Sequence, residues 1–188
     1  MAITQREFTL EQFLKLPEQE PALEYLDGMV TRKMSPKGPH GTLQFEIGSF
    51  FREFVWPRRL ARVFTETRTT YAGASFVPDL VVYRWERVPS DDQGDIPEEL
   101  QTPPDIAVEI WLPGQTLADL VDRCRWYVEH GVSVALFVHP RRRWVRVFRS
   151  GVELGPLSSP ARIDLGDVLS GFELDLAELF RWLRARPD

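Results

Sequence analysis

The fold is decided by residues 105–138, which read DIAVEIWLPGQTLADLVDRCRWYVEHGVSVALFV. Residues 105–112 are almost continuously apolar, as expected for a central strand that is covered on both faces. Residues 116–130 then place apolar side chains three and four positions apart, which predicts an amphipathic helix, and residues 132–138 are again apolar. This order of strand, helix and strand predicts two parallel neighbouring strands joined by a right-handed crossover.

The segments around this unit predict a mixed α/β (α+β) arrangement. Thr9 with Gln12 forms the capping-box pattern that begins a helix, and Asp27-Gly28 is the turn pair of a tight β-hairpin. Residues 87–104 contain four prolines and several acids, so we expect a surface loop. The remaining predicted elements are a hairpin over 23–34, a long amphipathic helix over 40–56, a strand pair over 63–71 and 76–83, a strand over 144–148 and a closing helix over 175–184.

Length and composition limit the class of protein. At 188 residues the chain fits a single domain, which we divide into an N-terminal helix and hairpin over 1–36, a core over 37–150 and a closing segment over 151–188. The single cysteine, Cys124, lies in an apolar position without a partner, so we expect a core residue in a reducing compartment. Since no secretion signal or membrane-spanning apolar run is visible, we expect a cytoplasmic protein without membrane contact.

The charge pattern allows local rather than general contact with phosphates. The net charge is -5, from 28 acidic and 23 basic residues, which argues against a surface that binds phosphates everywhere. The arginines gather in two clusters, Arg58, Arg59 and Arg62, and then Arg141, Arg142, Arg143 and Arg146. Each cluster suits anion contact, but a solvated face is the more common origin of such clusters, and both interpretations stay open.

Two carboxylates interrupt apolar strands and require a partner. Glu109 lies between Val108 and Ile110, and Asp79 begins the apolar run after Pro78. An ionised carboxylate in such a position is costly unless a cation or several donors compensate it. On adjacent strands the two acids would suit Mg²⁺, which commonly binds one or two carboxylates. The alternative is structural, with Asp79 capping a turn or paired with an arginine, and Glu109 held by an arginine of its own.

A series of short motifs then follows in a fixed order: Leu23-Glu24-Tyr25-Leu26-Asp27-Gly28, Ser35-Pro36 with His40, Pro78-Asp79, Val108-Glu109-Ile110, and Tyr127 with Gly131. Together they span nearly the whole chain, and in this order the chain resembles the Uma-two family of restriction-endonuclease-like proteins. The resemblance implies a PD-(D/E)XK nuclease core, in which a central mixed β-sheet is flanked by helices and preceded by a helix and hairpin extension. It also implies Mg²⁺, or Mn²⁺, as cofactor.

The resemblance assigns roles to particular residues. Asp79 and Glu109 inherit the metal-ligand positions. Glu24 matches the acidic position before the first turn and is our choice for a third catalytic acid, while Glu46, on the flank of the helix over 40–56, is the alternative. His40 is expected to contact substrate or position water at the start of its helix, against the alternative of a structural helix-terminal histidine.

The chain departs from the family pattern at the lysine. Trp111 stands two residues after Glu109, where the superfamily motif has lysine, and the position one turn before Tyr127 holds Arg123. Arginine supplies charge and a fork that fits phosphate, but it cannot serve as a general base. We therefore expect Arg123 to bind the scissile phosphate, unless it only neutralises Glu109 or Asp119. Leu112 and His139 also replace the serine and aspartate that are frequent in the family.

Three functional hypotheses follow from these residues. The first is an Mg²⁺-dependent endonuclease that hydrolyses DNA phosphodiester bonds. The second is a catalytically degenerate member that only binds nucleic acid or a protein partner, for which Arg123 is a sign of lost catalysis. The third is an assembly protein, a homodimer formed through exposed aromatic side chains. No Gly-rich phosphate loop, Cys/His metal cluster or nucleophile elbow is present, so a nucleotide cofactor, structural zinc and esterase chemistry are not expected.

Overall fold

The computed structural model describes residues 8–186 and centres on a six-stranded mixed sheet. Across the sheet the strands are β10 (Val152–Leu157), β9 (Trp144–Arg149), β8 (Val134–His139), β7 (Ile106–Ile110), β6 (Leu80–Arg84) and β3 (Ala61–Thr65). Strands β7 and β8 are parallel, and α3 (Leu117–Glu129) joins them, which confirms the unit predicted from residues 105–138. All other neighbouring pairs in this sheet are antiparallel.

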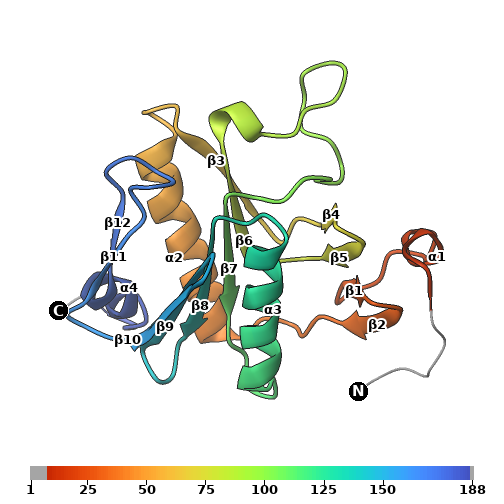
Figure 1. Ribbon diagram of the computed structural model, residues 1–188. Helices are drawn as coiled ribbons and strands as arrows, with labels where there is room; N and C mark the ends of the chain where they lie inside the picture. The colour runs from red at the N-terminus through yellow and green to blue at the C-terminus, as the bar shows by residue number, and fades with distance from the viewer. Residues whose placement is uncertain (1–7, 187–188) are drawn as a thin grey trace.

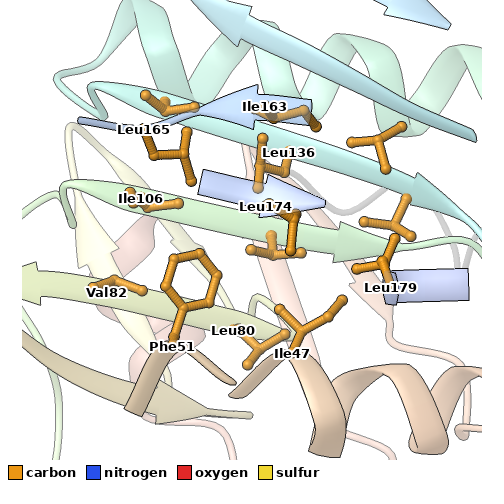
Figure 2. Close-up of a cluster of buried hydrophobic side chains, with 14 of the residues drawn as sticks. Ile47, Phe51, Leu80, Val82, Ile106, Leu136, Ile163, Leu165, Leu174 and Leu179 are labelled. Atoms are coloured by element: carbon orange, nitrogen blue, oxygen red, sulfur yellow. The ribbon is translucent and has the colours of Figure 1, made fainter. Parts of the chain in front are cut away.

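Helices cover both faces of the six-stranded sheet (Figure 1). One face packs against α2 (Gly38–Val55) and α4 (Leu176–Arg181), and the other packs against α3. Figure 2 shows the first of these cores, where Phe51 and Ile47 of α2 meet Leu80 and Ile106 of the sheet. The central mixed sheet between helices agrees with the predicted fold class.

The alternation of side chains along β7 places Glu109 on the α3 side of the sheet. Val108 and Ile110 belong to the core under α2, whereas Ala107 packs into the core under α3. Because successive strand residues point to opposite faces, Glu109 shares the face of Ala107. The register pairs Leu80 with Val108, so Asp79 is the next position opposite Glu109.

A second, four-stranded sheet carries the N-terminal hairpin. Its order is β2 (Met29–Arg32), β1 (Leu23–Leu26), β5 (Ala74–Phe76) and β4 (Thr69–Tyr71). The predicted turn is present, with Asp27 and Gly28 both at positive φ (47° and 82°). Before it, α1 (Leu10–Leu14) has the predicted capping box between Thr9 and Gln12. Thus the hairpin is one half of a sheet rather than an isolated extension.

The pairing predicted between residues 63–71 and 76–83 is confirmed, but the two strands are not continuous. Each predicted strand is split, so that β3 pairs with β6 in the large sheet while β4 pairs with β5 in the small one. The breaks fall at Glu66, which has a positive φ of 49°, and beside Pro78, which has no N–H for a ladder. The chain therefore passes twice between the two sheets, and Asp79 lies at one of these passages.

The remaining segments close the structure. After the 3₁₀ turn η1 (Trp85–Arg87), the predicted loop is held by Leu100, which is fully buried and bonds through its backbone to Arg68 and Thr70. The closing segment also contains β11 (Arg162–Asp164) and β12 (Glu173–Asp175), which were not predicted. Seven residues at the start and two at the end of the predicted 1–188 domain lie outside the described residues. No helix within residues 8–186 is long and apolar enough to cross a membrane.

Two phenylalanines of α2, one buried and one exposed, provide a test of the packing of this core. Phe51 is fully buried and stacks on Phe172 with ring centroids 4.6 Å apart, whereas Phe45 is 69% exposed. We expect Phe51→Ala to lower the free energy of unfolding by about 3–5 kcal/mol, through lost transfer energy and a residual cavity. Phe45→Ala is the control and should change it by less than about 0.5 kcal/mol in urea unfolding. Equal effects of the two substitutions would contradict this packing.

Candidate active site

An open cleft of about 710 Å³ lies between the β1–β2 hairpin and α3, beside the end of β7. Every site residue expected from the sequence, with the exception of the alternative acid Glu46, lines it. A further residue that was not expected, Lys33, lines it as well. The charged and polar side chains that matter for the chemistry are Glu24, Lys33, His40, Asp79, Glu109 and Arg123.

Asp79 is 2% exposed and accepts three polar contacts. Its Oδ2 atom accepts from His40 Nε2 at 3.0 Å and from the backbone N–H of Ile110 at 2.7 Å. Its Oδ1 atom lies 2.8 Å from Lys33 Nζ. Burial acts to raise the pKa of Asp79, but the hydrogen bond from His40 and the charge of Lys33 outweigh burial and hold it below its ordinary value. Asp79 is therefore a carboxylate at neutral pH.

Lys33 is the functional candidate that the sequence reasoning missed. It follows β2 directly, its side chain is 10% exposed, and its Nζ atom also lies 2.7 Å from Glu66 Oε2. Gln44 Nε2 donates to the other oxygen of Glu66 at 2.7 Å and so fixes that carboxylate. Burial acts to lower the pKa of Lys33, but the charges of Asp79, Glu109 and Glu66 raise it above its ordinary value. The ammonium is thus a fixed positive charge in the cleft.

Glu109 has a different environment from Asp79. It is 3% exposed, and its Oε1 atom accepts from Tyr127 OH at 2.6 Å. Arg123 Nη1 lies 3.6 Å from the same oxygen. Burial raises the pKa of Glu109 to about 7, with further contributions from the negative charges of Asp79 and Glu24, although Arg123 and Lys33 act in the opposite direction. Glu109 can therefore exchange its proton near neutral pH.

Glu24 and Arg123 form a bidentate pair that connects the hairpin to α3. The two Nη atoms of Arg123 lie 3.0 and 2.6 Å from the two carboxylate oxygens of Glu24. Glu24 Oε1 also accepts from the backbone N–H of Val77 at 2.9 Å, two residues before Asp79. The guanidinium carbon lies 4.9 Å from the ring centroid of Phe76, within cation–π range. The fork that we expected to bind phosphate is thus engaged by Glu24.

The structural alternative, in which Asp79 and Glu109 are each paired with an arginine, is found only in part. Asp79 is paired with a lysine and a histidine rather than an arginine, and Glu109 shares its nearby guanidinium with Glu24. His40 is 2% exposed and its Nε2 atom contacts Asp79, so in this structure the histidine holds that acid in place. Trp111 lies outside the cleft lining, stacks on His139 at 4.4 Å and donates from Nε1 to Gln115.

The carboxylates of the cleft suit an ion such as Mg²⁺, which keeps several waters, better than a metal whose ligands all come from protein. No group of three or more His, Cys, Asp or Glu side chains within residues 8–186 is placed to hold a metal ion. Two carboxylates, Asp79 and Glu109, line the open cleft together. Mg²⁺ commonly takes one or two protein carboxylates and keeps several waters, so two acids suffice. A cation beside them would also offset the repulsion from Asp79 and Glu24, which adds to burial in raising the pKa of Glu109.

Comparison with solved structures places this fold among nuclease-like α/β proteins. The chain superposes with a TM-score of 0.89 on the crystal structure of "a putative nuclease belonging to DUF820 from Anabaena variabilis ATCC 29413". The two are 34% identical over 94% of this chain and 99% of the other. A DrdV–DNA complex determined by cryo-electron microscopy matches at 16% identity over 77% of this chain and 12% of that chain, with a TM-score of 0.39.

The family profile agrees with the resemblance noted from the motifs. The chain belongs to the Uma2 family, described as "Putative restriction endonuclease", whose profile matches residues 10–177. A search of curated proteins found no match. The matched range includes the hairpin that carries Glu24 and Lys33 as well as both strand acids.

The raised pKa of Glu109 predicts how stability depends on pH in the absence of divalent ions. Between pH 4.5 and about 7 the folded protein keeps a proton on Glu109 that the unfolded chain releases. The contribution of Glu109 to the free energy of unfolding should therefore fall by on the order of 3 kcal/mol as the pH rises through this window. Glu109→Gln cannot titrate and should lack this loss.

The measurement is urea unfolding in EDTA across this pH window, with Glu46→Gln, which changes an acid outside the cleft, as the matched control. The stability of Glu109→Gln relative to wild type should rise with pH, while that of Glu46→Gln should not. If the free energies of unfolding of wild type and Glu109→Gln differ by a constant amount across the window, the raised pKa of Glu109 is refuted.

Proposed function

We propose that the protein is a divalent-metal-dependent endonuclease that hydrolyses phosphodiester bonds in DNA. The observation that carries the proposal is the pair of buried acids, Asp79 and Glu109, which line one open cleft together with the ammonium of Lys33, whose side chain is 10% exposed. Membership of the Uma2 family and the likeness to a protein described as a putative nuclease support the same class of reaction.

We assign the ion, Mg²⁺ or Mn²⁺, to Asp79 and Glu109. When bound there, a divalent cation would supply positive charge to a phosphoryl oxygen and to the attacking water. Asp79 is already ionised, and its geometry is fixed by donors from His40 and Ile110. Glu109 is oriented by Tyr127 and has to release its proton to act as a ligand. Binding of the ion should therefore release protons near neutral pH.

We assign the role of the missing motif lysine to Lys33. Because its pKa is raised, Lys33 stays protonated and cannot accept a proton from water. Its ammonium therefore acts as a hydrogen-bond donor and a fixed positive charge. A phosphate in the cleft would receive a hydrogen bond from Nζ, which stabilises the charge that develops when the phosphorus–oxygen bond breaks. The bond to Asp79 keeps the ammonium beside the two acids.

Glu24 and Arg123 have a positioning role in this proposal. Glu24 holds the backbone N–H of Val77, and Arg123 holds Glu24, so the pair fixes the chain immediately before Asp79. His40 acts on the same acid from α2. Arg123 also lies 3.6 Å from Glu109 and adds positive charge to the site. An arginine can meet all these requirements, because none of them calls for proton transfer.

Loss of one metal ligand tests the nuclease proposal directly. Asp79→Asn keeps the shape of the side chain but removes the negative charge, and we expect cleavage of plasmid DNA in Mg²⁺ or Mn²⁺ to fall at least about 100-fold. Asp167→Asn, an equivalent change at an exposed residue that does not line the cleft, should cleave like wild type. If wild type binds DNA but does not cleave it with either ion, the binding-only hypothesis replaces the enzyme.

The role of Lys33 is tested against another lysine of the same chain. Lys33→Met should reduce the cleavage rate by about 100-fold, since one charged donor to the transition state is lost. Lys15→Met removes a lysine whose side chain is 72% exposed and should leave the rate unchanged. Thermal unfolding of each variant separates loss of activity from loss of fold. Cleavage by folded Lys33→Met at the wild-type rate would exclude the proposed role.

A further inference from the structure

A pair of exposed tryptophans lies at the opposite end of α2 from the cleft. Trp56 follows the last residue of α2, and Trp85 begins η1 after β6. They are 42% and 43% exposed, and their ring centroids lie 5.7 Å apart at an angle of 62°. His40 marks the cleft end of α2, and the sixteen residue-to-residue steps from His40 to Trp56 span about 24 Å at 1.5 Å per step. Figure 1 shows the end of α2 and β3 at the upper end of the molecule, away from the β1–β2 hairpin.

Four arginines belong to the segment 52–62 that carries Trp56, and together with the two tryptophans they form what we call the Trp56–Trp85 patch. The guanidinium carbons of Arg52 and Arg62 lie 5.4 and 5.1 Å from the ring centroid of Trp56. That of Arg58 lies 4.2 Å from the ring of Phe54. The arginines of the patch are Arg52, Arg58, Arg59 and Arg62.

The positive charge of this patch is not neutralised by ion pairs. Among the described residues, none of its four arginines lies within salt-bridge distance of a carboxylate. The neighbouring Arg84 and Arg87 differ, because both pair with the buried Asp105 at 2.9 and 2.6 Å. Two acids border the patch, Glu53 on α2 and Glu86, which lies 3.6 Å from Arg84. On a chain of net charge -5, an excess of unpaired arginines beside exposed indole rings requires an explanation.

We propose that the Trp56–Trp85 patch binds single-stranded nucleic acid, separately from the cleft. Phosphates would contact the unpaired guanidinium groups, and bases would stack on the exposed indole and guanidinium planes. A duplex fits less well, because its base faces are covered by neighbouring base pairs. An acidic peptide would satisfy the charges but would leave the exposed ring of Trp85 without a stacking partner. This binding site goes beyond the proposed nuclease activity and does not depend on it.

The test is binding of a labelled single strand of about 20 nucleotides, longer than the roughly 4–16 nucleotides that such a site covers. Fluorescence anisotropy in EDTA measures binding without cleavage, with separate DNA and RNA strands to identify the sugar. We expect wild type to bind at least one of them, and Trp85→Ala to bind about tenfold more weakly through lost stacking. The double variant R52E/R58E should lose at least about tenfold and show a shallower salt dependence.

The second arginine cluster supplies a charge-matched control. R141E/R142E changes two exposed arginines of the turn between β8 and β9 and should stay within about threefold of wild type, since it removes only long-range attraction. Two results would overturn the proposal: no binding of either strand by wild type, or losses in the Trp85→Ala and R52E/R58E variants no larger than in this control. Because the assay contains EDTA, inactivity of the cleft does not affect the result.

Discussion

The ion pair between Lys33 and Asp79 is the interaction on which the rest of the site depends. The two atoms lie 2.8 Å apart, and the side chains are 10% and 2% exposed, so water contributes little to the stability of either charge. The pair ties the N-terminal hairpin to the start of β6 and thereby fixes the small sheet against the large one. Without the ammonium, Asp79 would be a buried carboxylate supported only by His40 and a backbone N–H.

Asp79 and Glu109 have pKa values shifted in opposite directions because their surroundings differ. Donors around Asp79 lower its pKa, whereas burial and neighbouring negative charge raise that of Glu109 to about 7. Without an added cation, the site tolerates this crowding by keeping a proton on Glu109 for part of the time. The bidentate pair of Glu24 and Arg123 limits the charge further, since these two groups neutralise each other. A divalent cation would replace that proton and allow both acids to be ionised.

Local patterns predicted the elements of the fold, but not all of their partners. Residues 105–138 predicted two strands and their helix, since buried strands and amphipathic helices have distinct periods, and Asp27-Gly28 predicted its turn. The pairing of residues 63–71 with 76–83 was predicted, but its division between two sheets depends on long-range packing and was not. Lys33 lies 46 positions before Asp79 in the sequence and belongs to no metal-binding spacing. Its only local signals are the motif Ser35-Pro36 and the rarity of lysine in this chain.

In the proposed site, Asp79 and Glu109 together hold a divalent cation beside Lys33. A crystal of the protein soaked in Mn²⁺ and measured for anomalous scattering tests it most directly, because the ion is located independently of any substrate. We predict a peak within coordination distance of both carboxylates in the wild type, and none at that position in Asp79→Asn. An empty cleft under saturating Mn²⁺, with Asp79 still bound to Lys33 and Glu109 to Tyr127, would contradict it.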